Sequence, residues 1–381
     1  MATPTDPNDQ RFMTAALGLA RRGLGRVWPN PAVGCILVAP GGAVVGRGWT
    51  QPGGRPHAET EALRRAGDAA RGAIAYVTLE PCSHTGKTGP CSDALIRAGV
   101  ARVVAATEDP DPRVAGSGLD QLRKAGIEVR VGVVRGDAER LNAGFFHRVL
   151  HGRPLVTAKL ATTLDGRVAT HRGESKWITG ELARAWGHAL RASHDALITG
   201  ATTVRTDDPD LTCRLPGMGD ASPVRVVMDS HLNTPLTSRL AATARKYPTW
   251  IVTCEDPPRD RRAAFVDCGI EVIEVAADDG GRPDVDATLA ALGARGITRA
   301  MVEGGPHLMA TFFRTGAVDR IAWFRAASVM GGDGLAGINA FGVDRLLQMR
   351  HFVRRRTVPC GVDQLEIYDR VGSPLGASGE A

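Results

Sequence analysis

Three potential metal ligands and one carboxylate lie in a single stretch of the sequence. His57 and Glu59 are two residues apart, and Cys82 and Cys91 follow, each directly after a proline. One imidazole and two thiols suit a borderline-soft ion such as Zn²⁺, and three protein ligands leave a fourth tetrahedral position for water. A carboxylate beside that water can carry protons. The set is typical of zinc deaminases, although eight residues separate the cysteines where the usual signature has two.

A structural zinc site closed by four protein ligands is the alternative, and His84 could be the fourth ligand. We favour a catalytic site, because a carboxylate such as Glu59 has no task beside a closed zinc site. Asn30 and His84 lie in loops predicted to flank the pocket, where they could hydrogen-bond a base, and Lys87 could contact a phosphate. Ordinary loop polarity is the alternative for these three residues.

Alternating strand and helix patterns indicate that an α/β domain positions these residues. The predicted helices span 8–25, 57–67, 91–98, 119–125 and 137–150, and the predicted strands span 33–38, 43–49, 74–79, 102–107 and 127–133. Ligands of such sheets bind beyond the carboxyl ends of strands, which is where Cys82 lies. Cys91 begins a helix, whose dipole favours a thiolate. Because residues two apart point to different sides of a regular helix, we expect His57 and Glu59 in a distorted first turn.

The segment His151-Gly152-Arg153-Pro154 indicates a boundary, so we expect one domain at 1–150 and a second at 151–381. The second domain has a predicted helix at 181–192 and predicted strands at 155–161, 196–199, 224–228, 250–253, 270–275, 300–303, 320–324 and 362–368. Strands and helices alternate again there, which predicts a second α/β domain.

Two glycine-rich motifs occur in the second domain. Glu303-Gly304-Gly305-Pro306-His307 follows an apolar strand and opens a helix, where glycines would let the backbone approach a phosphate. A plain strand-to-helix turn is the alternative. The stretch from Gly332 to Gly337 matches G-x-G-x-x-G, but only 44 residues follow it, too few for a further mononucleotide-binding unit. We therefore expect a flexible loop there.

The composition, with 43% hydrophobic and 23% charged residues, is that of a soluble globular protein. The net charge of +6 favours anionic partners, but aromatic residues make up only 5% and no basic run is interleaved with them. Small phosphorylated ligands are therefore favoured over nucleic acid. Seven scattered cysteines indicate reduced thiols. Without a signal-peptide pattern or an apolar run of about 20 residues, we expect a cytoplasmic protein that does not cross a membrane.

Several longer motifs, in order along nearly the whole chain, carry a resemblance to a known family. They read NPAVG, HAETEAL, EPCSHTGKTGPC, DPDPRVAGSG, KLATTLDGRVA, GESKWITG, ALITGATTVRTDDPDLTCR and VEGGPHL. Together they resemble the bifunctional riboflavin-biosynthesis deaminase–reductases. The resemblance implies an α/β protein, with a cytidine-deaminase-like fold first and a dihydrofolate-reductase-like fold second. Gly89 is a departure, because the family usually has a proline at that position.

The resemblance also implies roles for individual residues. It implies a zinc ion on His57, Cys82 and Cys91, with Glu59 as the catalytic proton shuttle. It implies NADPH contacts at Thr162, Trp177, Thr203, Asp207, Ser230, Gly305, Pro306, His307 and Leu308. It implies substrate contacts at Ser175, Arg191, Leu211, Arg214 and Glu303, with Lys159 in the same pocket. Lys159 and Glu303 are our candidates for handling charge at the sugar, and Arg191 or Arg214 for binding the phosphate.

The implied activity has two steps: zinc-dependent deamination of 2,5-diamino-6-ribosylamino-4(3H)-pyrimidinone 5′-phosphate, then NADPH-dependent reduction of the ribosyl side chain to ribityl. Two alternatives belong to other classes. One is a nucleic-acid base deaminase with an RNA-binding second domain, and the other is a zinc-stabilised module that binds a nucleotide without catalysis. Residue spacing alone does not distinguish NADPH from NADH, and it leaves a homo-oligomer open.

Overall fold

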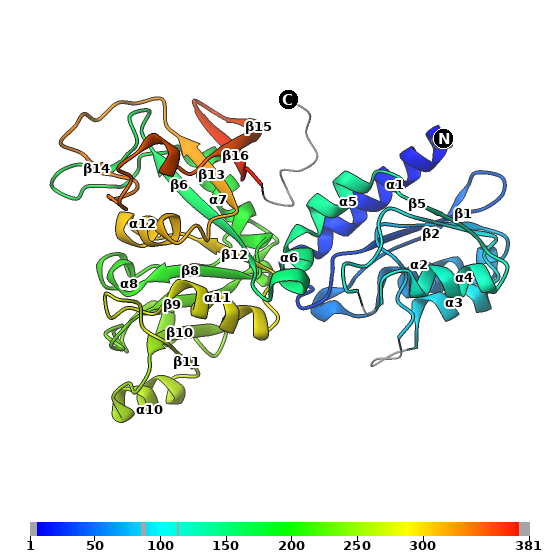
Figure 1. The fold of residues 1–381 in the computed structure, drawn as a ribbon, viewed down its shortest axis with the longest axis horizontal. Helices are drawn as coiled ribbons and strands as arrows, with labels where there is room; N and C mark the ends of the chain where they lie inside the picture. The colour runs from blue at the N-terminus through cyan, green and yellow to red at the C-terminus, as the bar shows by residue number, and fades with distance from the viewer. Residues whose placement is uncertain (1–5, 85–88, 113, 373–381) are drawn as a thin grey trace. The chain divides into compact units, whose positions relative to one another are not determined.

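The computed structural model describes residues 6–84, 89–112 and 114–372 of the 381-residue chain. The chain divides into two compact units, Met1–His151 and Gly152–Ala381, and each is built around its own β-sheet (Figure 1). Within the described residues, no helix has both the length and the apolar character that a bilayer-spanning segment requires.

The first unit has a five-stranded sheet in the order β2-β1-β3-β4-β5. Its strands are β1 Gly34–Val38, β2 Val44–Trp49, β3 Ile74–Val77, β4 Arg102–Ala105 and β5 Glu128–Val131. Its helices are α1 Pro7–Ala20, α2 Ala58–Ala66, α3 Cys91–Ala98, α4 Ser117–Lys124, α5 Arg135–Leu141 and α6 Ala143–His151. Strand β1 is antiparallel to both of its neighbours, whereas β3, β4 and β5 are parallel.

Side chains alternate along β1 and pack against helices on both faces of this sheet. Ile36 and Val38 belong to one apolar cluster with Met13 of α1, whereas Leu37 belongs to another with Ala62 of α2. Figure 1 shows α1 and α5 over one face and α2, α3 and α4 over the other. The two cores follow from the two-residue period of a strand.

Helix α2 lies directly against β2, because two glycines of that strand allow the approach. A Cβ atom on Gly48 would lie 2.1 Å from the carbonyl oxygen of Ala58, and one on Gly46 would lie 2.4 Å from that of Ala62. Any larger side chain would push α2 away from the sheet. The glycines therefore fix the position of His57, which precedes the first residue of α2.

The second unit has a nine-stranded sheet in the order β11-β10-β9-β8-β12-β6-β13-β16-β15. Its strands are β6 Leu155–Thr162, β8 Ala196–Gly200, β9 Val224–Met228, β10 Thr249–Cys254, β11 Glu271–Val275, β12 Arg299–Val302, β13 Arg320–Arg325, β15 Phe352–Cys360 and β16 Asp363–Arg370; β7 Arg167–Ala169 pairs separately with β14 Leu335–Ala336. Its helices are α7 Glu181–Ala192, α8 Ala201–Asp207, α9 Arg239–Ala242, α10 Arg259–Asp267, α11 Val285–Ala294 and α12 Pro306–Arg314. Seven neighbouring strands of this sheet run parallel, in the order β11-β10-β9-β8-β12-β6-β13. Their carboxyl ends therefore lie at one edge of the sheet.

The sequence predicted most elements of the first unit, and the differences have local causes. The predicted helix 8–25 ends at Ala20 and continues only as a 3₁₀ turn, Arg21–Gly23. The prediction of one helix at 137–150 is wrong, because α5 and α6 are separated at Asn142. The Asn142 side chain exchanges two hydrogen bonds, of 2.9 and 3.0 Å, with the backbone of Ala32. This tertiary contact fixes the break.

In the second unit, the segment Gly332–Gly337, predicted as a flexible loop, contains the two-residue strand β14. The Asp165 carboxylate accepts hydrogen bonds from the backbone N–H of Met330 (3.1 Å) and Gly331 (2.8 Å), which precede it. Strand β15 was not predicted, because the three consecutive arginines 354–356 interrupt the apolar–polar alternation that marks a strand.

A buried ion-pair cluster ties α1 to the sheet of the first unit. Asp9 is fully buried, and its Oδ1 accepts hydrogen bonds from the Tyr76 hydroxyl (3.0 Å) and from Arg102 (3.1 Å). Its Oδ2 accepts hydrogen bonds from Arg102 (2.9 Å) and Arg130 (3.2 Å). The carboxylate thus links α1 to β3, β4 and β5.

We predict that Asp9→Ala destabilises the first unit by about 3–5 kcal/mol, because it leaves partly buried arginines without this carboxylate. Hydrogen exchange of the full chain, followed by mass spectrometry, should show faster exchange in β3 to β5 and unchanged exchange in the second unit. Asp68→Ala, which removes an exposed carboxylate, is the matched control. Equal protection of β3 to β5 in both variants would contradict the prediction.

Candidate functional site

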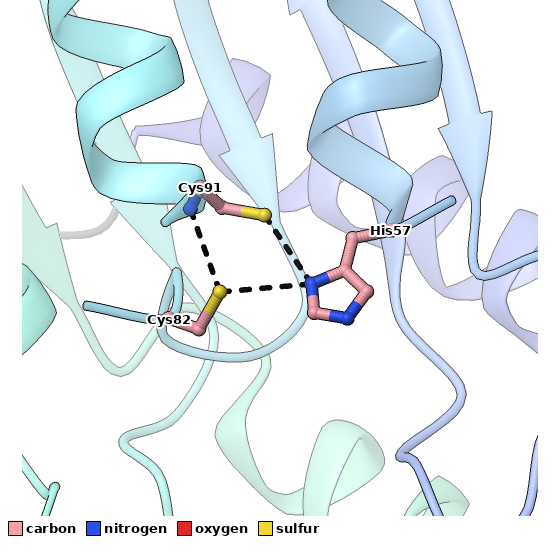
Figure 2. A group of neighbouring side chains, drawn as sticks. All are labelled: His57, Cys82 and Cys91. Atoms are coloured by element: carbon pink, nitrogen blue, oxygen red, sulfur yellow. Dashed lines mark hydrogen bonds between the residues drawn. The ribbon is translucent and has the colours of Figure 1, made fainter. Parts of the chain in front are cut away.

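The three predicted metal ligands converge in the first unit, as Figure 2 shows. His57 is the N-cap of α2, Cys91 is the first residue of α3, and Cys82 lies in the loop after β3. The His57 Nδ1 atom is 3.6 Å from the Cys82 Sγ atom and 3.3 Å from the Cys91 Sγ atom. The ligand atoms all lie within 4.8 Å of one another.

These donor atoms fit a tetrahedral zinc ion. Zinc–sulfur bonds of about 2.3 Å and zinc–nitrogen bonds of about 2.0 Å place nitrogen and sulfur about 3.5 Å apart, as His57 and both cysteines do. The Cys91 backbone N–H points at the Cys82 sulfur, 3.4 Å away. Hydrogen bonds from Cys91 and His57 lower the pKa of the Cys82 thiol to about 4, so a thiolate is present at neutral pH.

His84 is exposed and is not part of this ligand group. Among the residues that the structure describes, the group of potential metal ligands contains His57, Cys82 and Cys91 alone. A site with three protein ligands leaves a coordination position for water, which is the arrangement of catalytic rather than structural zinc.

Glu59 lies in the first turn of α2 with only 4% of its surface exposed. Burial raises the pKa of its carboxyl to about 7, against the opposing effect of the His57 imidazole. Such a group can take up and release protons at neutral pH. The expected distortion of the first turn is not found: α2 begins regularly at Ala58, and His57 precedes it with the extended conformation that is usual for an N-cap (φ −69°, ψ 162°). Because His57 lies outside the helix, the direction of its imidazole is not set by the angular spacing of helical side chains.

A second buried carboxylate, to which the sequence analysis gave no role, holds the loop beside the ligands. Glu80 accepts hydrogen bonds from the backbone N–H groups of Asp109 (3.1 Å), Gly116 (2.9 Å) and Gly118 (2.8 Å). A Cβ atom on Gly118 would lie 1.9 Å from the carbonyl oxygen of Pro81. The loop therefore packs against the residue that precedes Cys82. An acid directly before a Pro-Cys ligand pair was the only signal for Glu80 in the sequence.

The loop residues predicted to contact a base have different surroundings. The side-chain amide of Asn30 lies against Gly54, where an added Cβ atom would be 1.8 Å from Asn30 Nδ2. Asn30 is thus close to the chain that leads into His57. His84 lies near Asp109, and burial raises the pKa of the Asp109 carboxyl. Lys87 lies outside the described residues.

In the second unit, two cations meet at one carboxylate at the carboxyl end of β12. Lys159 Nζ is 3.2 Å from Glu303 Oε1, and Arg191 contacts both oxygens of Glu303 at 3.0 Å. A third N–H of Arg191 donates to the carbonyl oxygen of Thr212 (3.0 Å). Burial alone would raise the pKa of Glu303, but Lys159 and Arg191 outweigh it and hold the pKa well below its usual range. Glu303 is therefore an anion at neutral pH.

The remaining predicted substrate contacts surround this cluster unevenly. Arg214 is exposed, its guanidinium is 3.7 Å from Asp210, and its backbone N–H donates to His188 Nδ1 (3.3 Å). Leu211 is buried in an apolar cluster, so only its backbone can face a ligand. Ser175 is exposed. The structure thus brings Lys159 and Arg191 to Glu303 and leaves Arg214 free to reach a ligand from solvent.

A cavity of about 310 Å³ lies at the carboxyl ends of β8 and β9, against the first turn of α12. Three of the predicted nucleotide contacts line it, namely Ser230, His307 and Leu308. Gly305 is the N-cap of α12 and Pro306 its first residue. A Cβ atom on Gly305 would lie 3.9 Å from the Thr203 hydroxyl, so this threonine faces the same turn. The lining also holds Arg205, His231 and Arg282. Basic groups and a helix N-terminus suit a phosphate-bearing nucleotide such as NADPH.

Thr162, Trp177 and Asp207 are among the predicted nucleotide contacts that do not line this cavity. Thr162 is buried, and its hydroxyl donates to the carbonyl oxygen of Thr163 (2.8 Å) and accepts from Trp323 (2.8 Å). Trp177 is 68% exposed beneath the guanidinium of Arg184. Asp207 is exposed at the end of α8. Any contact from these residues would involve a part of the ligand outside the cavity.

Comparison with protein families gives two matches, one in each unit. Residues 6–107 match the cytidine and deoxycytidylate deaminase zinc-binding region, and residues 154–356 match the RibD C-terminal domain. The riboflavin biosynthesis protein RibD of Bacillus amyloliquefaciens is 42% identical over 326 residues, which cover 85% of this chain and 86% of that protein. RibD of Aquifex aeolicus is 39% identical over 362 residues, which cover 95% and 98%.

Solved structures agree over the same length. Acinetobacter baumannii RibD (form 1) is 36% identical with a TM-score of 0.85, and the match covers 96% of this chain and 99% of that chain. A diaminohydroxyphosphoribosylaminopyrimidine deaminase/5-amino-6-(5-phosphoribosylamino)uracil reductase from Thermotoga maritima is 33% identical with a TM-score of 0.82, covering 95% and 99%. The predicted order of an α/β deaminase domain followed by an α/β reductase domain is confirmed.

We predict that Cys91→Ser weakens zinc binding by more than about 100-fold. Mutating a residue that only hydrogen-bonds a metal ligand lowers metal affinity by about 10- to 100-fold, and removing the ligand itself should lower it further. Metal analysis after dialysis against a chelator should show one zinc per chain in the unchanged protein and almost none in the variant. Cys254→Ser, in the second unit, should keep its zinc. Full zinc in Cys91→Ser, with circular dichroism showing a folded chain, would refute the ligand assignment.

Proposed function

The chain belongs to the RibD family of bifunctional riboflavin-biosynthesis proteins, a zinc deaminase fused to an NADPH-dependent reductase, and from this premise we propose which residues perform each step. The first unit, 1–150 by the sequence boundary, performs the deamination, and the second, 151–381, the reduction. The observation that carries the proposal is the meeting of His57, Cys82 and Cys91 beside the buried Glu59.

The substrate of the first step is 2,5-diamino-6-ribosylamino-4(3H)-pyrimidinone 5′-phosphate. His57, Cys82 and Cys91 would hold a zinc ion, which would supply a water molecule of lowered pKa. Glu59 would take one proton from the attacking water and deliver it to a ring nitrogen, then take the remaining proton of the new hydroxyl group and give it to the amino group, which leaves as ammonia. Its pKa near 7 suits both directions of transfer. Asn30, His84 and Lys87 are proposed to hold the base and the phosphate.

In the second step, NADPH supplies a hydride to C1′ of the ribose. We assign Lys159 to give a proton to the sugar oxygen as the ring opens, because its ammonium group carries protons that the ionised Glu303 lacks. Glu303 holds Lys159 in place, and Arg191 in turn holds Glu303. Arg214 is then the better candidate for the substrate phosphate, since Arg191 is engaged by Glu303 and Thr212.

The alternative of a nucleic-acid base deaminase is not favoured, because the second unit matches a RibD C-terminal domain rather than an RNA-binding module. We propose small phosphorylated pyrimidines as the partners of this chain. We also propose a cytoplasmic location, because all seven cysteines are free thiols and reduced thiols at a metal site are typical of that compartment.

We predict that Glu59→Ala lowers the rate of ammonia release by about 100-fold or more, because a positioned acid–base group contributes at least that factor. Zinc content and NADPH oxidation with the deaminated substrate should stay unchanged. Glu61→Ala, which removes the neighbouring acid paired with Arg64 and Arg65, is the control and should keep both activities. Loss of both activities in a folded Glu59→Ala protein would refute the division of labour between the units.

For the reductase, we predict that Glu303→Gln lowers kcat by about 100-fold or more, because it removes the anion that orients Lys159. Lys159→Met should have a similar effect, and the double variant should be little worse than either single one, since the two groups act as a unit. Lys246→Met, at an exposed site, is the matched control. Ammonia release should be normal in every case. Additive losses in the double variant would contradict the coupling.

A further inference from the structure

The cavity beside α12 holds two guanidinium groups that the reaction itself does not use. Arg205 reaches it from α8, and Arg282 reaches it from the turn before α11, so the two cations line different walls. Among the described contacts, the Arg205 side chain has one weak hydrogen bond, to the Thr202 hydroxyl at 3.5 Å. Ion pairs between described residues include neither guanidinium. Both are exposed and can turn toward a ligand in the cavity.

Hydrogen bonds within one turn fix the backbone around Arg282. The Asp278 carboxylate accepts hydrogen bonds from the backbone N–H groups of Gly280 (2.9 Å) and Arg282 (3.0 Å), and Asp278 N–H donates to the Arg282 carbonyl oxygen (2.6 Å). A bridge between Ala277 and Pro283 closes the same turn. The turn therefore presents Arg282 from a defined position.

The acidic residue of the cavity lining, Asp229, is not available to bind the 2′-hydroxyl group of a ribose. A carboxylate at a strand end commonly binds the 2′-hydroxyl of NADH, and Asp229 directly follows β9. Asp229 is only 3% exposed, and its two oxygens accept hydrogen bonds from the backbone N–H groups of Asn233 (2.9 Å) and Thr234 (2.6 Å). Its carboxylate is engaged by the backbone of the turn 229–234, and the other charged or titratable side chains of the lining are arginines and histidines.

The sheet order places this cavity away from the reacting end of the cofactor. The Lys159–Glu303 pair lies at β6 and β12, whereas the cavity extends to β9, in the order β9-β8-β12-β6. Three strand spacings separate β9 from β6, or about 14 Å. A dinucleotide whose nicotinamide lies at Lys159 therefore has its adenosine half in the cavity.

We propose that Arg205 and Arg282 bind the 2′-phosphate on the adenosine ribose of NADPH and so select NADPH over NADH. The inference rests on the proposed reductase function and adds the residues that determine coenzyme specificity. A planar guanidinium on each side of a phosphate matches its oxygens with paired N–H donors. His231, on the same lining, adds a further donor.

The test measures binding of adenosine 2′,5′-bisphosphate and adenosine 5′-monophosphate to the full chain by calorimetry. The two probes differ only in the 2′-phosphate. The unchanged protein should bind the bisphosphate about 10- to 100-fold more tightly, as one or two charge-assisted hydrogen bonds would give. Arg205→Gln combined with Arg282→Gln should abolish that preference and leave the affinity for the monophosphate unchanged. Arg259→Gln, an exposed arginine outside the cavity lining, should keep the preference.

Kinetics give a second reading of the same variants. The double variant should show a higher KM for NADPH and an unchanged KM for NADH. Equal binding of both probes by the unchanged protein would overturn the proposal, and so would an equal loss of both probes in the variant. Loss of the preference with reduction intact supports the proposal. If the unchanged protein bound neither coenzyme and reduced no substrate, the reductase function itself would be refuted. That outcome differs from a protein that reduces its substrate but does not distinguish NADPH from NADH.

Discussion

The convergence of one ring nitrogen and two sulfur atoms is the constraint on which the first unit depends. Three polar ligands come from different elements, and each must be held within a few tenths of an ångström for one ion to bind them all. Two of them start helices, and α2 is pressed against β2 at Gly46 and Gly48. Packing of backbone on backbone therefore fixes the geometry of the metal site more firmly than side-chain contacts could.

Burial around that site also explains why Glu59 differs from other acids of the unit. Asp9 and Glu80 are buried as well, but Asp9 is paired with arginines and Glu80 with backbone N–H groups. Both arrangements stabilise a carboxylate. Glu59 lies where burial raises its pKa to about 7, which is the property a proton carrier needs. The groups around each buried carboxylate thus distinguish Glu59, the proposed proton carrier, from Asp9 and Glu80, which hold the structure together.

In the second unit, the pKa of the acid proposed to take part in the reaction is shifted in the opposite direction from that of Glu59. Glu303 is partly buried, but a lysine and an arginine lower its pKa, so it remains ionised and acts as a fixed anion. The contact holds the Lys159 ammonium group 3.2 Å from Glu303 Oε1. Both reactive clusters lie beyond the carboxyl ends of strands, where loops can differ in sequence without disturbing the sheet.

The sequence by itself determined the chemistry of the metal site and the order of the two domains. His57, Glu59, Cys82 and Cys91 sit in short segments whose residue types and helix starts are visible locally. Only the tertiary structure decided which cations meet Glu303, because Lys159 and Arg191 are 144 and 112 residues away from it along the chain. The same holds for the cavity, whose walls come from separate strand ends. Side-chain pairing across a sheet depends on strand order, which local periodicity does not encode.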